Sequence, residues 1–294
     1  MSDLNQLIFQ LKHLRGIGNK GLLRILQYFM DNPEKEVTAE CCLKIGRVKK
    51  NYHSTFLDSF EQAMTFTDDY YFEFLERFSF LTILDDAYPD YLREIYNPPI
   101  ALFYQGNISF LDTPTLGMIG SRKSTSYGKE MIDYLMPELC EKGITIVSGL
   151  AKGNDTSAHQ ASIRNHGKTI AVIGCGLNCY YPKENQRLQE FIAKQHLIIS
   201  EYLPNTKPLA YHFPSRNRII AGISQGVCVV EAKKKSGTYI TAQLALEEGR
   251  EVYAIPGNPL SDQSEGCLHL IQEGAKCVWR PEDILEDWCF KKRK

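Results

Sequence analysis

The sequence has no long hydrophobic run, no excess of one charge and no signal for secretion. No apolar stretch approaches the roughly 20 residues that span a membrane, and the first residues, MSDLNQLIFQLKHLRG, place charges inside an amphipathic helix pattern, unlike a secretory signal. The 34 Lys and Arg residues nearly balance 35 Asp and Glu residues, for a formal net charge of −1. A nucleic-acid partner would therefore have to bind to a local basic patch rather than to the overall field.

The nine cysteines contain no CxxC pair. Cys41 and Cys42 are adjacent, and Cys175 and Cys179 flank a predicted turn without a second pair or a histidine cluster nearby. This spacing predicts buried thiols and no metal site. Because cysteines are used without secretion features, we expect the protein in the reducing cytoplasm.

The 294 residues are enough for two domains, and the sequence pattern changes near residue 80. We predict a helical domain over residues 1–80 and an α/β domain over residues 81–290. Within the first, LRGIGNKGLL (14–23) predicts two helices joined by a Gly-Ile-Gly turn. Such a helix-hairpin-helix can hold a DNA phosphate on its exposed backbone N–H groups. A tight helical corner that needs glycine for positive φ is the alternative, and both stay open.

The stretch that follows is strongly acidic. Residues 58–90 contain nine Asp and Glu residues and one base, Arg77. This charge repels phosphate, so it argues against a strong DNA role for the whole helical domain. A solvated face or a surface for a basic partner is the expected use.

From residue 80 onward apolar runs alternate with helical patterns. The runs are FLTIL (80–84), IALFYQ (100–105), TLGMIG (115–120), ITIVSGL (144–150), TIAVIG (169–174), HLIIS (196–200), GVCVVEA (226–232), EVYAIPG (251–257) and KCVW (276–279). Continuous apolar strands are buried on both faces, which predicts a doubly wound, Rossmann-like and mostly parallel sheet covered by helices. A ligand should lie at the carboxyl ends of its strands.

Those strand ends carry glycines and bases. They read GSRK (120–123), SGLAKGND (148–155), GCGLNCYYPKEN (174–185), EAKKKSGTYITA (231–242) and PGN (256–258). The dinucleotide fingerprint is incomplete, because Cys179 replaces the third glycine after Gly174 and Gly176, so we expect no NAD or FAD. Ser236-Gly237-Thr238 opens a predicted helix and suits either an anion or an ordinary Ser N-cap.

The segment KPLAYHFPSRNRIIAG (207–222) begins the most basic stretch. Residues 207–235 contain six Lys and Arg residues and one acid, Glu231. Two aromatic residues, Tyr211 and Phe213, are interleaved with these bases. Arg216 and Arg218 fall at the predicted start of a helix, where the dipole disfavours cations unless an anion binds. Guanidinium groups with stacking rings suit single-stranded DNA. The alternative is a structural Arg pair bonded to carbonyls and to Glu231.

Seven segments together resemble the motif series of the DNA-processing protein A (DprA/Smf) family. In chain order they are GSRKSTSYG, SGLAKGNDTSAHQ, AVIGCGLNCYYPKEN, SEYLPNTKP, FPSRNRIIAG, VVEAKKKSGTYITAQLALEEGREVYAIPGN and EGCLHLIQEGA. The resemblance covers roughly residues 80–280, and the helical N-terminal domain over residues 1–80 also fits the SAM-like or helix-hairpin-helix domain of that family. Asn154 stands where the family usually has Ile, and the chain stops soon after WRPEDILEDW, without the winged-helix domain of many members.

This resemblance implies a single-stranded DNA-binding protein of natural transformation. Family members protect incoming strands, help load the recombinase RecA and work as homodimers, with no established catalytic activity and no cofactor or metal. Motif by motif, the residues expected to line the DNA groove are Arg122, Lys123, Lys152, Lys183, Arg216, Asn217, Arg218, Ser236, Gly237 and Thr238. A strand presents one phosphate per nucleotide, so a row of cations suits it better than a single glycine loop does.

The C-terminal segment GCLHLIQEGAKCVW (266–279) predicts a short helix followed by a terminal strand. Its apolar residues exceed what one helix at a sheet edge can bury, which predicts a two-fold dimer through Leu268, Leu270, Ile271 and Cys277. The family resemblance implies the same. These residues could instead complete the core of a monomer.

A nucleotide hydrolase is the alternative function. The fold also resembles the LOG-type phosphoribohydrolases, which carry a PGGxGTxxE loop where this chain has KKKSGTYIT. Thr241 stands at the position of the acid, so no carboxylate is available there to stabilise the transition state. His159 is the best remaining candidate base, although a structural histidine buried on a helix is the more usual use of such a residue.

Overall fold

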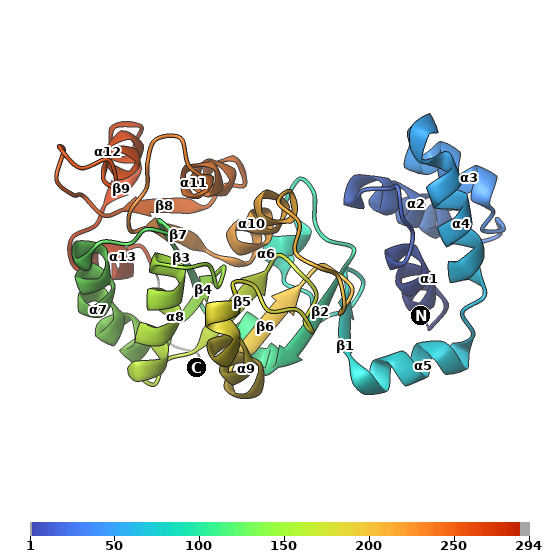
Figure 1. The fold of residues 1–294 in the computed structure, drawn as a ribbon, viewed down its shortest axis with the longest axis horizontal. Helices are drawn as coiled ribbons and strands as arrows, with labels where there is room; N and C mark the ends of the chain where they lie inside the picture. Colours follow the sequence, from blue (N-terminus) through green and yellow to red (C-terminus); the bar gives the residue numbers. More distant parts are fainter. Residues whose placement is uncertain (1, 289–294) are drawn as a thin grey trace. The chain divides into compact units, whose positions relative to one another are not determined.

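The chain forms two compact units, shown in the computed structural model of Figure 1. The structure describes residues 2–288. The first unit runs to Tyr88 and includes Tyr96–Tyr104, and the second consists of Pro89–Ile95 and the residues from Gln105 onward. The two domains predicted from the sequence, residues 1–80 and 81–290, stay a prediction. Among the described residues, no helix combines the length and apolar character needed to cross a membrane, and the cysteines are free thiols.

The first unit is helical and ends in an antiparallel pair of strands. Its elements are α1 (Ser2–Lys12), α2 (Asn19–Asp31), α3 (Ala39–Gly46), η1 (Lys50–Tyr52), α4 (His53–Met64), α5 (Asp68–Arg77), β1 (Ser79–Thr82) and β2 (Ala101–Gly106). The helices pack around buried Ile8, Leu11, Ile25 and Phe56. β1 pairs antiparallel with β2, whereas the strands of the second unit run parallel.

The turn between α1 and α2 confirms the predicted helix pair and shows why glycine is needed there. Gly16 has φ +75°, and a Cβ at this position would lie 2.9 Å from Cβ of Tyr52. Gly18 instead has φ −96° and precedes α2 as an extended residue without a side-chain cap. The conformational requirement therefore falls on Gly16 alone.

The second unit is a parallel sheet with helices on both faces. Its strands are β3 (Thr115–Ile119), β4 (Thr145–Ser148), β5 (Thr169–Ile173), β6 (Leu197–Ser200), β7 (Gly226–Val229), β8 (Glu251–Ala254) and β9 (Lys276–Cys277). The helical elements are α6 (Asp90–Arg93), η2 (Ile108–Asp112), α7 (Ser126–Glu141), α8 (Asn154–Arg164), η3 (Lys183–Asn185), α9 (Gln186–Gln195), α10 (His212–Ile223), α11 (Gly237–Glu247), α12 (Glu265–Gln272) and α13 (Glu282–Leu285). Each predicted strand is present, and the predicted α/β fold class is confirmed.

The strand order places the ligand-binding edge. Within this unit the order is β6-β5-β4-β3-β7-β8-β9, and β3 pairs in parallel with both β4 and β7. The chain therefore builds one half of the sheet outward from β3 and then returns to begin the other half at β7. Every residue of β3, β4, β5, β6 and β7 is buried, as expected for strands covered on both faces. The order reverses between β3 and β7, so a ligand is expected beside their carboxyl ends.

His159 lies fully buried on α8, as a structural histidine. Its Nδ1 is 2.7 Å from Oγ1 of Thr169, and that hydroxyl donates in turn to the carbonyl of Ile146 at 2.8 Å. The ring must therefore donate through Nδ1, while its buried Nε2 has no partner among the described residues. Burial, with smaller contributions from His196 and Arg216, lowers the pKa of His159 to about 3.

This depressed pKa predicts a loss of stability in acid. The unfolded chain binds a proton at His159 below about 6.5 and the folded chain does not, so the stability present above that pH is lost progressively toward about pH 3. Between pH 6 and pH 4, the free energy of unfolding should fall about 1.4 kcal/mol per pH unit more steeply for the wild type than for His159→Gln. Urea denaturation at several pH values measures both slopes, and equal slopes would contradict the assignment.

Candidate nucleic-acid interface

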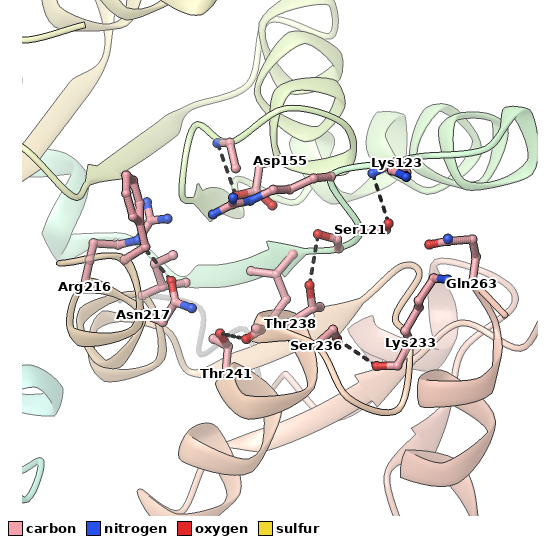
Figure 2. A pocket seen from close by; sticks show the side chains of 17 residues that line it. Ser121, Lys123, Asp155, Arg216, Asn217, Lys233, Ser236, Thr238, Thr241 and Gln263 are labelled. Carbon is pink, nitrogen blue, oxygen red and sulfur yellow. Dashed lines mark hydrogen bonds between the residues drawn. The ribbon is translucent and has the colours of Figure 1, made fainter. Parts of the chain in front are cut away.

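The loops that follow β3, β4 and β7 surround a cavity at the order reversal of the sheet. This strand-end pocket has a volume of about 490 Å³, and α10 and α11 complete its wall. Figure 2 shows side chains from these elements arranged around it, with Ser121, Lys123 and Asp155 on one side and Ser236, Thr238 and Lys233 on the other. The pocket lies where the topology alone predicts a ligand.

Most of the predicted DNA-binding residues come together here. Those lining the strand-end pocket are Arg122, Lys123, Arg216, Asn217, Ser236, Gly237 and Thr238. Lys152 lines a side pocket of about 470 Å³, which also includes Arg122 and Lys123, so the two cavities adjoin. Lys183 and Arg218 line neither pocket. The structure thus forms one continuous basic groove from loops that are distant in sequence.

Arg122 and Lys123 extend from the loop after β3 into solvent. The backbone N–H of Lys123 donates to Oγ of Ser121 at 3.1 Å. The Arg122 guanidinium lies 5.6 Å from the ring centroid of Phe213, and Phe213 in turn packs 5.0 Å from the ring of Tyr181. A cation held beside two rings can bind a phosphate while leaving an aromatic surface for a base.

Glu231 anchors this loop from beneath. It is buried, and it accepts hydrogen bonds from the backbone N–H and the hydroxyl of Thr125 at 3.0 and 2.6 Å and from Nδ2 of Asn154 at 2.9 Å. Thr125 also caps α7 through its hydroxyl. The carboxylate therefore ties the loop after β3 to the first residue of α8.

Three glycines make room for this network. A Cβ at Gly120 would lie 2.5 Å from Nδ2 of Asn154, and one at Gly128 would lie 2.3 Å from Oε2 of Glu231. Gly153 has φ +80°, and a Cβ there would meet the carbonyl of Ser121 at 2.4 Å. Asn154, where the resembled family usually has Ile, is fully buried, so its amide adds a polar bond at a position where Ile would only pack.

Ser236 and Thr238 use their hydroxyls within the protein. Ser236 caps α11 by accepting from the N–H of Tyr239 at 3.2 Å, and it donates to the carbonyl of Lys233 at 2.7 Å. Thr238 donates to the carbonyl of Gly120 at 3.0 Å. The N-cap alternative for Ser236 is therefore confirmed, while a contact of this turn with DNA stays a prediction. Gly237 has open space where a Cβ would be.

Arg216 lies in the interior of α10 rather than at its start. The helix begins at His212, four residues earlier than the position of the Arg pair suggested. The guanidinium is buried and donates to the carbonyls of Gly149 and Val172. A Cβ at Gly149 would lie 2.5 Å from Nη1 of Arg216, so this glycine lets the guanidinium reach the end of β4. Arg216 thus crosslinks two strand ends from the pocket wall.

Arg218 forms a largely buried ion pair outside the pocket. It donates to both carboxylate oxygens of Glu201, at 2.6 and 2.7 Å. The alternative of a structural Arg pair is therefore correct in part. Arg216 binds carbonyls as predicted, but the carboxylate partner of Arg218 is Glu201 and not Glu231. A single nitrogen, Nη2 of Arg218, makes both contacts, and this ion pair holds α10 to the end of β6.

The remaining predicted cations lie on the exposed rim. Lys152 forms an ion pair with Glu184 at 2.5 Å, and the hydrogen bond from Lys152 lowers the pKa of Glu184. Lys183 begins the short helix η3 and is exposed. Both side chains are solvated, so binding an anion there would cost little free energy.

The sequence did not single out two further charged residues that line the pocket. Lys233 lies in the KKK run and pairs with Asp262 at 3.1 Å; its place just before Ser-Gly-Thr at a strand end could have identified it. Asp155 is buried and accepts N–H bonds from Gly149 and Ala151 at 3.2 and 3.4 Å. Burial raises the pKa of Asp155, against the opposing field of Arg216. No pattern in the sequence marks which acid turns inward.

The glycines of the incomplete dinucleotide motif contact the protein itself. A Cβ at Gly174 would meet the ring of Phe213 at 2.9 Å, and one at Gly176 would meet the carbonyls of Leu203 and Pro204 at 2.2 Å. Burial raises the pKa of the intervening Cys175 to about 12. Among the described residues, no cluster of His, Cys, Asp or Glu is placed to hold a metal.

The hydrolase alternative finds no support in the pocket. Thr241 lines it but donates its hydroxyl to the carbonyl of Gly237 at 2.8 Å, within its own helix. His159, the candidate base, is fully buried and is not among the described residues that line the pocket.

The predicted dimer residues differ in exposure. Leu268 and Ile271 on α12 are partly buried, Leu270 is fully buried, and Cys277 on β9 is exposed. Leu270 therefore belongs to the core of the unit, and only the other three present surface to a partner. The neighbouring Trp279 is 58% exposed.

Comparison with known proteins finds one matching family model and similar proteins over nearly the whole chain. The model of the family "DNA recombination-mediator protein A" matches residues 79–289. The DNA processing protein DprA of Streptococcus pneumoniae is 44% identical over 290 residues, which is 99% of this chain and all of that protein.

Solved structures agree with this match. The X-ray structure of DNA processing protein A from Streptococcus pneumoniae superimposes with a TM-score of 0.87 at 44% identity, covering 98% of this chain and 99% of that one. The Helicobacter pylori DNA processing protein A, whose structure describes its single-stranded DNA binding mode, has a TM-score of 0.64 at 31% identity, covering 72% of this chain and 98% of that one.

The Glu231 network predicts a specific stability effect. Glu231→Ala should leave the N–H of Thr125 and the amide of Asn154 without partners in a buried site, which costs about 2–3 kcal/mol. The near-isosteric Glu231→Gln keeps an acceptor and should lose less than half as much. Urea denaturation measures both values. If the two variants are equally stable, the network does not anchor the loop.

Proposed function

The chain belongs to the DNA recombination-mediator protein A family, and from that premise we propose that it binds single-stranded DNA along the strand-end pocket during natural transformation and homologous recombination. The observation that carries this proposal is the groove formed by the two adjoining pockets. Arg122, Lys123, Lys152 and Lys233 surround it, and Asp155 and Asp133 are the carboxylates among its described lining residues.

The chemistry of the groove suits a strand rather than a single nucleotide. Successive cations on separate loops can each meet one phosphate of a chain. The rings of Phe213 and Tyr181 beside Arg122 offer stacking to an unpaired base, which needs no sequence readout. In a duplex the bases are already stacked on one another, so these rings would contribute little. A preference for single strands follows.

The residues of the groove divide by what they contact. We assign direct phosphate contact to the exposed cations Arg122, Lys123, Lys152 and Lys183. Four residues of the inner wall would also contact the strand: Asn217, Ser236, Gly237 and Thr238. Arg216 is also in the wall, where its carbonyl bonds keep the guanidinium fixed for a phosphate. Arg218, bound to Glu201, contributes by holding α10 in place.

The wider role is proposed from the family and from the groove together. The protein would protect incoming strands and help load the recombinase RecA, acting in the cytoplasm without a cofactor and without catalysing a reaction. Membership in a recombination-mediator family supports this role. The carboxylate that a phosphoribohydrolase places at the matching strand end is replaced here by Thr241, which bonds its own helix.

Binding should distinguish single strands from duplex. We expect tighter binding of a single strand than of the matched duplex, with affinity that falls steeply as salt rises. Arg122→Ala removes one phosphate contact, so it should weaken binding roughly four-fold near 0.15 M salt and lower the slope of log K against log salt by about 0.7. Gel shifts or fluorescence anisotropy across a salt series measure these values.

A matched control is Lys142→Ala, which removes an exposed cation outside both pockets. It should leave affinity and slope unchanged. Equal binding of single strand and duplex at moderate salt would exclude the proposal. An Arg122→Ala protein that binds normally would exclude this loop as the contact.

We also propose that the protein is a homodimer through α12 and β9. β9 lies at the edge of the sheet, and Leu268, Ile271, Cys277 and Trp279 leave apolar surface beside it. One patch can serve both partners across a two-fold axis. A dimer would present two grooves, so one strand could engage both and gain avidity.

Leu268→Asp should therefore give a folded monomer that binds long strands more weakly. Phe191→Asp, which also places a charge at a half-exposed apolar position but on α9, is the matched control and should stay dimeric. Light scattering at micromolar concentration reports the mass of each protein. A monomeric wild type would refute the dimer.

A further inference from the structure

One end of the helical N-terminal unit collects positive charge. Residues 12–30 and 41–57 contain eight Lys and Arg residues and no Asp or Glu. The first group extends from the end of α1 to the middle of α2, and the second extends from the last turn of α3 to η1. The cations are Lys12, Arg15, Lys20, Arg24, Lys44, Arg47, Lys49 and Lys50.

The fold brings these two segments together. A Cβ at Gly16 would lie 2.9 Å from Cβ of Tyr52, and a Cβ at Gly21 would lie 2.9 Å from the carbonyl of Gly46. That same carbonyl accepts a hydrogen bond from Arg24 at 3.2 Å. The end of α3 and the helix η1 therefore pack directly against the α1–α2 turn, and their cations share one surface. Figure 1 shows α1–α4 gathered in one bundle.

Seven of these eight cations are exposed and have no carboxylate partner among the described residues. Arg15, Lys20, Arg24, Lys44, Arg47, Lys49 and Lys50 are all exposed, and none forms an ion pair within residues 2–288. In the strand-end groove, by contrast, Lys152 and Lys233 each pair with a carboxylate. Like charges gathered without counter-ions repel one another, so this surface is best matched by a polyanion.

The acids of these helices lie at their other ends. Asp31 ends α2, Glu40 lies in the first turn of α3, and Glu34 and Glu36 occupy the connection between the two helices. The acidic stretch over residues 58–90 begins at the second turn of α4. The local charge at the α1–α2 turn is therefore positive even though the chain as a whole is nearly neutral.

We propose that this basic end, defined by Arg15, Lys20, Arg24, Lys44, Arg47, Lys49 and Lys50, is a second contact for the DNA backbone. The inference rests on the proposed function, because it adds a phosphate-binding surface to a DNA-binding protein. Protein–protein interfaces have an apolar centre, whereas nucleic-acid interfaces are dominated by positive charge. The large rings here are Tyr52 and Tyr96, and Lys20 lies 3.9 Å from the centroid of the Tyr96 ring. A polyphosphate fits this surface better than an acidic protein does.

The test removes three of these cations from the full-length protein. The variant Arg47→Gln, Lys49→Gln, Lys50→Gln removes three charges but keeps unbranched polar side chains, and it leaves the strand-end groove intact. Its matched control, Lys35→Gln, Lys142→Gln, Lys194→Gln, removes the same charge from exposed positions outside both surfaces. Single-stranded oligonucleotides of increasing length, and matched duplexes, are titrated against each protein across a salt series.

We expect the first variant to bind the longer oligonucleotides at least ten-fold more weakly near 0.15 M salt, with the slope of log K against log salt reduced by about 2, as for three lost phosphate contacts. The shortest oligonucleotides that bind should be held equally well by all three proteins. The duplex arm shows whether the surface takes paired or unpaired backbone, since either loss supports a backbone contact.

Failure of the second contact can be told apart from failure of the proposed function. If the wild type binds DNA and the variant matches it in affinity and slope at every length, the second contact is excluded while the proposed function stands. If the control loses as much affinity as the variant, the effect comes from net charge and the second contact is again excluded. If the wild type binds no DNA, the proposed function itself is wrong.

Discussion

The buried carboxylate of Glu231 is the contact on which the binding edge depends. It lies just beyond β7, and its bonds reach Thr125 in the loop after β3 and Asn154 at the start of α8. Three chain segments that are far apart in sequence are thereby joined at one point. A buried acid costs desolvation unless its lone pairs are filled, and here they are filled by the loop that carries Arg122 and Lys123. The position of these cations thus follows from a hydrogen-bond network below the surface.

The basic side chains of the protein fall into two groups with different physical roles. Arg216, which is buried, and Arg218, which is largely buried, each use one guanidinium nitrogen to join two carbonyls or both oxygens of a carboxylate on neighbouring elements. The exposed cations of the groove and of the α1–α2 turn have solvated heads that cost little to redirect toward a phosphate. Burial, rather than residue type, separates the arginines that join elements of the site from the cations that are exposed on its surface.

Much of the fold could be read from local pattern. Continuous apolar runs predicted the strands, and helical spacing in the first residues predicted the hairpin around Gly16. Those signals are local, because burial of a whole strand or of one helix face imposes a periodicity on its own residues. The Arg pair predicts a start for α10 that is four residues too late, because α10 begins at His212. His212, which begins the helix, carries no such charge signal.

The sequence by itself determined the fold class, the alternation of strands and helices, and the family, because these are encoded in local periodicity and in a series of motifs. Tertiary structure decided which side chains share a surface. It buried Leu270 within the monomer, gave Arg218 the partner Glu201, turned Asp155 into the pocket and gathered the cations of residues 12–30 and 41–57 at one end of a helical unit whose later helices are acidic. Such pairings depend on contacts between residues distant in the chain, and no local pattern specifies them.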